Sequence, residues 1–463
     1  MLIVSKETSY QLNALSKFKI KVFAVLQPQI LKLNKILTFF SFESLLVYYF
    51  FLVLLLGRSF TGIGIFGFRV GELMIGSAMV LFIYFVVFKS KKVKDLLNDP
   101  LTIILRLIFI TFIVINTRKG GFDSFLNVEV YRSSSYMWSI GFLFVLNFIN
   151  RARLFDSSIF FTGLCFILPC VYILTSVYYP NFLDMFFMEY SDKLRLLKGS
   201  DLFIAYAIYC FLFFERIKNN NFIYIFTFVI SGLLIPLIVF SSRGASIGTF
   251  LVLIYCIFRN KNAFLRNKFL FFGSLIGFIA TLTLSSIYLD WTKIDFQEIN
   301  TSMAIDSLEM TLISKRYPET TKPYLFIEDN RINSGDGNLN WRLQIWQDVT
   351  EDLSDKKILF TGYGYENVIP AMAKLDRMGL DGTNIHVHNY FINILARGGL
   401  IHLVLFILFY MYLIKYIYEK KKSHNATIFI GAILFVAFFD SSMETVRYPF
   451  LFYTILSYKL VKE

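Results

Sequence analysis

Long apolar runs separated by short polar segments dominate the hydrophobic pattern of the chain. A helix that crosses a membrane needs about 20 mostly apolar residues. Twelve runs fit this description or come close to it, and the shorter ones can lie beside a water-filled cavity. They are expected near residues 36–57, 70–88, 101–116, 135–150, 157–179, 201–215, 221–242, 244–258, 269–289, 390–418, 426–440 and 448–461. The pattern predicts an all-α, polytopic helical membrane protein with about twelve transmembrane helices.

One long polar stretch interrupts this pattern, between the ninth and the tenth run. A structureless loop of roughly a hundred residues would be unusual, so we expect a small folded element with a function. The chain then divides into transmembrane helices 1–9 (residues 1–289), a loop domain (290–389) and transmembrane helices 10–12 (390–463).

Composition supports the membrane interpretation. Hydrophobic residues make up 56% of the chain, with 54 Phe, and charged residues only 17%. The four cysteines all lie inside apolar runs, so disulfides are not expected. The first 35 residues carry six lysines and lack the small-residue cleavage site of a signal peptide.

The net charge of +13 is explained by membrane topology. With the N-terminus in the cytoplasm, the inside segments hold 24 Lys and Arg, and the short outside segments hold 10. Because basic residues favour the cytoplasmic side, both termini are expected inside and the loop 290–389 outside. The charge therefore gives no reason to expect nucleic acid as a partner.

Two of the four histidines, His386 and His388, lie where the polar loop meets the tenth apolar run. Histidine can take or give a proton near neutral pH, so this pair is a candidate for proton transfer at a water-filled site. The alternative is an ordinary polar helix start, with Asn384 or Asn389 as its cap.

A second candidate is the corner Ser242-Arg243-Gly244, between the seventh and eighth runs. A helix is expected to begin here, so its backbone N–H groups and Arg243 would point at the same anion. The alternative is an interfacial arginine that reaches lipid phosphates.

A third candidate is the amphipathic helix expected over residues 340–353 of the loop. Helical spacing places Arg342, Trp346, Val349 and Leu353 on one face. Asn338 or Asn340 could cap this helix. The planar guanidinium of Arg342 suits two phosphate oxygens at once.

A glycine pair follows in Phe360-Thr361-Gly362-Tyr363-Gly364. It allows a tight turn or a close backbone approach, and is weak evidence for phosphate binding.

Together these motifs resemble the O-antigen polymerase and O-antigen ligase superfamily (Wzy/WaaL-like). The ordered set is Ser242-Arg243-Gly244, Arg342 with Trp346, Phe360–Gly364, and His388-Asn389 before a helix with Gly398-Gly399. The resemblance implies a membrane glycosyltransferase of the GT-C type, without metal or other cofactor, that uses a glycan linked to undecaprenyl pyrophosphate. It implies Arg243 and Arg342 as pyrophosphate-binding residues and His388 as the catalytic residue. His386, Asn389 and Trp346 are secondary candidates.

The chemistry agrees with this resemblance. Two arginines can stabilise the charge that develops on a leaving diphosphate, and a histidine can take the proton of an attacking sugar hydroxyl. The resemblance implies that the function is polymerisation of lipid-linked oligosaccharide repeat units at the outer face of a bacterial inner membrane. Its expected partners are the lipid-linked donor and acceptor, membrane lipid, a chain-length regulator and a flippase.

Two alternatives stay open. An O-antigen ligase would transfer the glycan to lipid A core, and the motifs do not separate it from a polymerase. A lipid-linked oligosaccharide flippase would also have about twelve spans. Flippases of that kind are expected to show two related halves and short loops, which this chain lacks.

Overall fold

The computed structural model describes most of the chain. The described residues are 42–88, 99–149, 158–193, 197–216, 221–289, 325–366, 368–374, 377, 386–421 and 424–461. The lysine-rich N-terminal arm, the first part of the predicted loop domain (290–324) and the alternative cap Asn384 lie outside them. The chain divides into two compact units, Met1–Phe51 and Leu52–Glu463.

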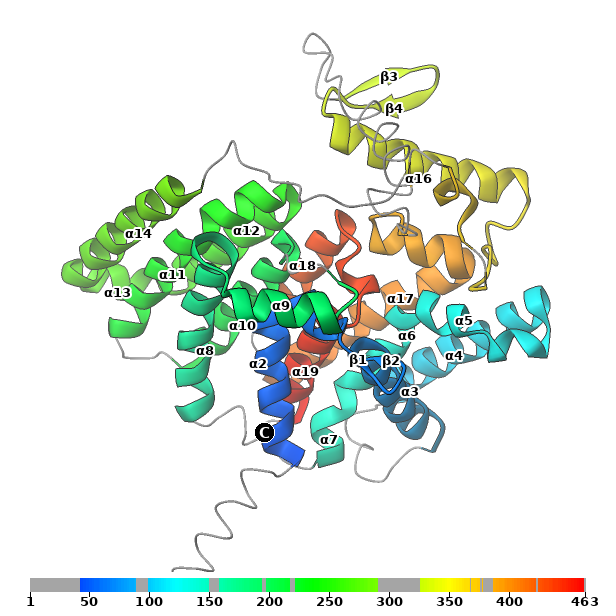
Figure 1. The fold of residues 1–463 in the computed structure, drawn as a ribbon, viewed down its shortest axis with the longest axis horizontal. Coiled ribbons are helices and arrows are strands. Elements are labelled where there is room, and N and C mark those ends of the chain that lie inside the picture. Colours follow the sequence, from blue (N-terminus) through cyan, green and yellow to red (C-terminus); the bar gives the residue numbers. More distant parts are fainter. Residues whose placement is uncertain are drawn as a thin grey trace, which may run out of the picture. The chain divides into compact units, whose positions relative to one another are not determined.

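Helices make up nearly all of the regular structure in the described residues (Figure 1). The α-helices are α2 Phe42–Thr61, α3 Val70–Phe88, α4 Asp99–Gly120, α5 Val128–Ser133, α6 Ser135–Trp138, α7 Val145–Ile149, α8 Ser158–Tyr172, α9 Asn181–Tyr190, α10 Gly199–Arg216, α11 Asn221–Ser241, α12 Arg243–Arg259, α13 Lys261–Arg266, α14 Lys268–Tyr288, α16 Gly337–Asp355, α17 Tyr390–Lys421, α18 Asn425–Phe438 and α19 Arg447–Val461. Shorter turns of helix are η2 Phe122–Leu126, η3 Ser139–Phe144, η5 Ile173–Val177, η6 Pro370–Met372 and η8 Ser442–Glu444. The all-α fold class is confirmed.

Two small antiparallel hairpins complete the described structure. Strands β1 Gly64–Ile65 and β2 Phe68–Arg69 pair with each other, and so do β3 Phe326–Glu328 and β4 Arg331–Asn333. In the second hairpin Phe326 lies opposite Asn333 and Glu328 opposite Arg331.

In their described residues, the twelve predicted runs are mainly helical. The run near 135–150 is the least regular, because it is divided among α6, η3 and α7. Among the described residues, seven helices are long and apolar enough to cross a membrane, by length and composition: Ser44–Thr61, Val70–Phe88, Pro100–Gly120, Phe160–Val177, Ile223–Ser241, Lys268–Ile287 and Tyr390–Lys420. Three shorter apolar helical segments are Ser135–Phe148, Gly199–Leu212 and Asn425–Phe438. The chain is a polytopic helical membrane protein.

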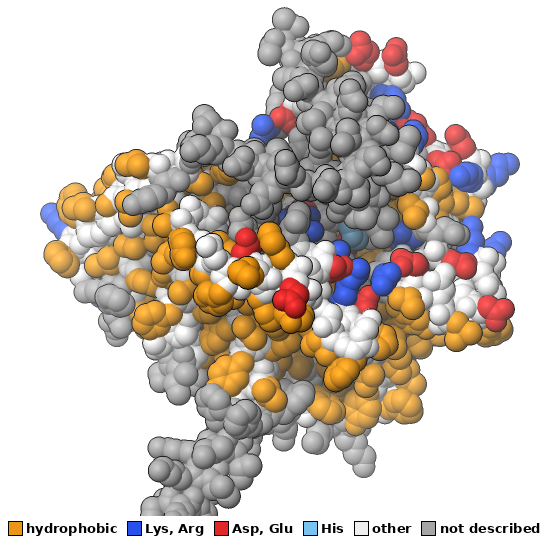
Figure 2. Space-filling view, in the orientation of Figure 1, with side chains coloured by type: hydrophobic (Ala, Val, Ile, Leu, Met, Phe, Trp, Pro, Cys, Tyr) orange, Lys and Arg blue, Asp and Glu red, His pale blue; other side chains and the backbone are white. Residues whose placement is uncertain are grey.

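Polar groups inside the apolar helices bond to neighbouring helices. Thr281 and Ser285 on α14 donate hydrogen bonds to the carbonyl oxygens of Val229 and Leu233 on α11, at 3.0 and 2.8 Å. Small hydroxyl residues of this kind join helices where lipid supplies no hydrophobic driving force. Figure 2 shows the hydrophobic side chains spread over the helices, with charged side chains gathered over β2 and the start of α3.

Helix α16 lies within the predicted loop domain and packs on the start of α17. Its buried side chains, Trp341, Ile345, Val349 and Leu353, repeat at intervals of four residues. They share one hydrophobic cluster with Val387, Leu395 and Ala396 at the start of α17. This stripe differs from the predicted face by one position, because Arg342 and Trp346 lie at its edge and Trp341 and Ile345 at its centre.

The N-cap of α16 also differs from the prediction. Asp336, rather than Asn338 or Asn340, caps the helix, and its Oδ1 accepts a hydrogen bond from the backbone N–H of Leu339 at 2.8 Å. A carboxylate at this position also complements the positive end of the helix dipole.

Candidate functional site

The start of α17 fixes the position of the histidine pair. Asn389 is the cap, and its Oδ1 accepts from the backbone N–H groups of Phe391 and Ile392 at 3.0 and 3.1 Å. The prediction of a cap at Asn389 is confirmed. Immediately before it, His388 has φ of 55°, in the left-handed region that residues with a Cβ rarely adopt. Strain of this kind is often found at functional sites.

Helix α16 holds the histidine segment on one side. The indole Nε1 of Trp346 donates to the carbonyl oxygen of Val387 at 2.8 Å. The ring of Trp341 meets the ring of His388 edge to face, with centroids 5.2 Å apart. The two tryptophans therefore position the backbone and the ring of this segment.

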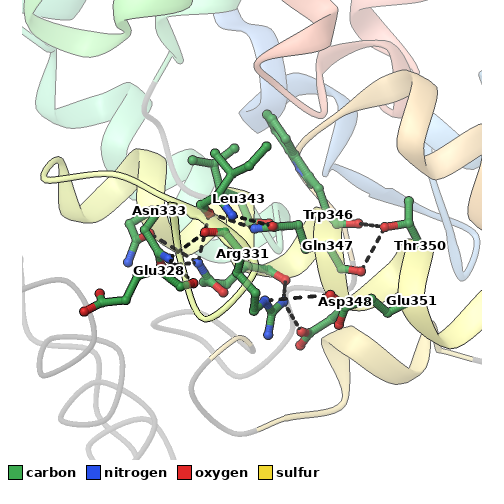
Figure 3. A network of polar contacts seen from close by, with 12 residues as sticks. Glu328, Arg331, Asn333, Leu343, Trp346, Gln347, Asp348, Thr350 and Glu351 are labelled. Atoms are coloured by element: carbon green, nitrogen blue, oxygen red, sulfur yellow. Dashed lines mark hydrogen bonds and ion pairs between the residues drawn. The ribbon is translucent and has the colours of Figure 1, made fainter. Parts of the chain in front are cut away.

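Polar contacts hold the β3–β4 hairpin against the outer face of α16 (Figure 3). Arg331 donates to Asp348 at 2.5 Å, and Gln347 accepts from the backbone N–H of Ile332 at 2.7 Å. Lys374 and Arg377 also pair with Asp348, at 2.8 and 2.6 Å. Burial favours a higher pKa for Asp348, but its three basic partners outweigh burial and lower that pKa to about 2. This network makes α16 a firm support for the residues on its other side.

The glycine motif 360–364 docks onto a break in α17. Gly399 has φ of 68° inside the helix, and a Cβ there would lie 2.2 Å from the backbone of Phe360. The freed carbonyl oxygens of Ala396 and Arg397 accept from Tyr363 and Gly364, at 2.7 and 3.0 Å. Only glycine leaves room for this contact. The motif therefore makes the predicted close backbone approach, and its N–H groups bond to α17 instead of facing a phosphate.

Arg243 lies at the first position of α12, as predicted. Ser242 caps this helix, and its hydroxyl accepts from the N–H of Ala245 at 3.3 Å. Arg243 forms an ion pair with Asp336, the cap of α16, although 72% of the arginine side chain is exposed. The α12 corner is thus joined to α16 through one carboxylate.

Arg342, in the first turns of α16, lies near the same α12 corner. One of its terminal nitrogens donates to the carbonyl oxygen of Phe439, just after α18. Its Nε is buried and has no hydrogen-bond partner among the described residues. A Cβ on Gly244 would lie 2.8 Å from Cβ of Phe439, so the glycine lets α12 approach this residue closely. Three elements distant in sequence therefore meet around Phe439.

The charges around His388 keep its ring neutral. Burial lowers the pKa of His388 well below its ordinary value of 6.5, and the positive charges of Arg342 and Lys198 lower it further. Asp440 opposes this shift. Burial would raise the pKa of Asp440 as well, but Lys198 and Arg342 outweigh burial and lower it to about 2. The site therefore presents an ionised carboxylate, two cations and a neutral imidazole at pH 7.

His386 lies in other surroundings. Its Nδ1 lies 2.6 Å from Oε2 of Glu444, a buried carboxylate on η8. The pocket beside this pair is lined by Arg132, Ser133, Ser135, His386, Asn393, Arg397 and Glu444.

The structure thus brings together the three main residues that the sequence predicted, Arg243, Arg342 and His388. Sequence reasoning missed four charged neighbours: Lys198, Asp336, Asp440 and Glu444. For Asp440 and Glu444 a signal existed, since both belong to one short polar segment between apolar runs. Asp336-Gly337 before a helical pattern could have indicated the cap. Nothing in the sequence singles out Lys198.

Metal ligation is not indicated by side-chain clustering. Within the described ranges, no three His, Cys, Asp or Glu side chains gather as metal ligands would. The metal-independent reaction stays a prediction.

Comparison with known proteins agrees with the motifs. A family described as O-antigen ligase matches residues 226–407, which include Arg243, Arg342 and His388. No curated protein matches the chain. The match does not separate polymerase from ligase. The resemblance predicted from the motifs is confirmed over residues 226–407, where the chain matches this family model.

Proposed function

We propose that the chain is a glycosyltransferase that polymerises oligosaccharide repeat units linked to undecaprenyl pyrophosphate. The observation that carries the proposal is the meeting of Arg243, Arg342 and His388 at the junction of α12, α16 and α17. In this reading the two arginines bind the pyrophosphate of the donor. The chemistry needs no metal, because two guanidinium groups can stabilise the leaving diphosphate.

The reaction is a single displacement. An acceptor hydroxyl oxygen attacks the anomeric carbon of the donor sugar, and the bond from that carbon to the pyrophosphate oxygen breaks. The hydroxyl proton passes to the neutral ring of His388, and undecaprenyl pyrophosphate leaves with the bonding electrons. A base of this kind contributes typically about 10²–10⁴-fold in rate. The lowered pKa of His388 supports this role, because the ring must be unprotonated to accept.

Of the two arginines, Arg342 is the better placed to bind a phosphate oxygen. Its buried Nε lacks a hydrogen-bond partner among the described residues, so a phosphate oxygen would satisfy a costly buried donor. Arg243 is exposed and tied to Asp336, so the donor has to compete with that carboxylate. We propose that donor binding transfers Arg243 from Asp336 to the pyrophosphate.

The proposal places the site outside the cytoplasm, at the outer face of the inner membrane. It keeps both termini in the cytoplasm and the division into 1–289, 290–389 and 390–463. Cysteines introduced at Asn333 and at Lys421 test this topology with a membrane-impermeant thiol reagent. We expect labelling from outside at position 333 only. Equal labelling at both positions would contradict the topology.

A ligase is the second candidate, since the matching family is described as O-antigen ligase. The glycan profile of a deletion strain separates the two functions. Loss of a polymerase leaves lipid A core that carries one repeat unit, whereas loss of a ligase leaves polymer on undecaprenyl pyrophosphate. The proposal predicts the first profile, and the second would replace polymerase by ligase.

A further inference from the structure

A second polar site lies beside His386. Its lining does not include Arg243, Arg342 or His388. Four parts of the chain contribute to it: the 132–135 region, the segment before α17, the first two turns of α17, and η8. Arg132 is held at its edge by Glu72 and Glu129, at 2.7 and 2.5 Å. The pocket is therefore built from elements that are also fixed elsewhere.

Glu444 is the group in this pocket that most needs a ligand. Its side chain is 3% exposed, and Oε2 is occupied by Nδ1 of His386. Its other oxygen, Oε1, is buried and has no hydrogen-bond partner among the described residues. A buried acceptor left unsatisfied is costly, and native structures usually supply it with a partner. Since Glu444 lines the pocket, a donor placed there would reach this carboxylate.

The backbone of Glu444 is held in place by α6. The hydroxyl of Ser135 donates to the backbone carbonyl oxygen of Glu444 at 2.7 Å, which joins α6 to η8. Burial raises the pKa of Glu444, against the opposing effects of His386 and Arg397. The backbone at Glu444 and the Oε2 atom beside His386 are thus held before any ligand arrives.

The size of the pocket limits the ligand. Its free volume of about 10 Å³ is close to the room needed by one water-sized group. A whole sugar ring does not fit, but one hydroxyl inserted from a sugar at the rim does. Asn393 and Arg397, on successive turns of α17, are further polar groups within the lining.

We propose that this pocket receives one hydroxyl group of the acceptor glycan, which donates a hydrogen bond to Oε1 of Glu444. The inference rests on the proposed function, since it supplies that reaction with an acceptor subsite. His386 and His388 are two residues apart, so a sugar held by one hydroxyl at the pocket can offer another to His388. The pocket would then determine which hydroxyl of the acceptor is glycosylated.

The test uses the full chain in nanodiscs and a defined probe. The probe is the repeat-unit oligosaccharide released by mild acid from the lipid-linked intermediate of the host cell, and its binding is measured by calorimetric titration. Glu444→Gln keeps the shape of the side chain and removes its charge, and we expect at least tenfold weaker binding. His386→Gln is the second variant, with weaker binding by a smaller factor. Glu129→Gln is the matched control, because Glu129 pairs with Arg132 without lining the pocket.

Polymer formation is measured on the same preparations, so the two proposals fail separately. Suppose that the wild type forms polymer and that both variants bind the oligosaccharide as well as the wild type does. This result would overturn the subsite and leave water as the occupant of the pocket. No binding by the wild type would overturn the subsite as well. Binding that is weakened in Glu444→Gln, but without any polymer from the wild type, would overturn the proposed function and keep the glycan pocket. If Glu444→Gln does not fold, the binding of His386→Gln decides the question.

Discussion

The two sides of the segment 386–389 differ in charge and in partners. His388 packs against Trp341 and lies near two cations, whereas His386 binds a buried carboxylate. In a regular extended strand, side chains two residues apart would point the same way. The left-handed backbone at His388 breaks that regularity. One short sequence can therefore serve two sites, and in our account they are the donor side and the acceptor side of one reaction.

The largest expected effect on the rate comes from a substitution on the donor side. Arg342→Lys keeps the positive charge but loses the planar fork, including the buried Nε donor. We expect polymer formation to fall by about 10²-fold or more, as when one transition-state donor is removed. Initial rates with purified lipid-linked repeat units measure this.

The control is Arg331→Lys on β4, which replaces an arginine of the same loop that faces Asp348. It should change the rate by less than about threefold. Equal losses in both variants would mean that Arg342 acts by supporting the loop.

The second prediction concerns the exposed arginine. Arg243→Lys should lower the rate by about tenfold, less than Arg342→Lys, because solvent screens the exposed side chain and weakens its contribution. Asp336→Asn retains a good helix cap and frees Arg243, so donor binding should tighten a few-fold. Weaker donor binding by Asp336→Asn would show that the carboxylate holds Arg243 in its working position.

The third prediction uses pH to sharpen the comparison. The positive charge of Lys198 helps to lower the pKa of His388, so Lys198→Gln should raise that pKa. Because the base works only when neutral, the acid limb of the rate profile should move to higher pH, by a few tenths of a unit. The alkaline side should not move. Lys193→Gln is the control, since Lys193 pairs with Asp192. If the acid limb of Lys198→Gln does not move, a group other than His388 determines the pH of that limb.

The smallest expected effect comes from a substitution in the contacts that support the loop. Asp348→Asn removes the shared partner of three basic side chains and should destabilise the loop by about 1–3 kcal/mol. Because the pKa of Asp348 is lowered, its stabilising effect is present above about pH 4 and is lost as the pH falls through about 2. Limited proteolysis at pH 7 measures the difference as faster cleavage of the loop. Unchanged cleavage would show that the apolar stripe alone holds α16.

The sequence predicted the helices well because apolar runs and their polar ends carry that information locally. The predicted runs are mainly helical over their described residues, and Asn389 caps α17 as expected. The resemblance predicted that Arg243, Arg342 and His388 work together. In the structure Gly244 and Arg342 meet at Phe439, and Trp341, next to Arg342, contacts His388.

Other features could not be predicted from local patterns. The pairing of Arg243 with Asp336 joins residues 93 positions apart, and that of His386 with Glu444 joins residues 58 apart. Such contacts depend on how the helices pack. The one-position difference in the buried face of α16 has a similar cause. Trp341 is buried because it packs against residues at the start of α17. This contact cannot be inferred from the periodicity of α16 alone.

The most direct test of the account is chain elongation by purified His388→Ala, compared with His386→Ala, on lipid-linked repeat units. Our account predicts that His388→Ala abolishes elongation while donor binding survives, and that His386→Ala lowers it to a lesser degree. His402→Asn, inside α17, checks for general damage to the helix and should have a smaller effect than His388→Ala. Near-normal polymer from His388→Ala, with loss from His386→Ala, would contradict the account and move the base to His386. Normal polymer from both would remove histidine from the mechanism.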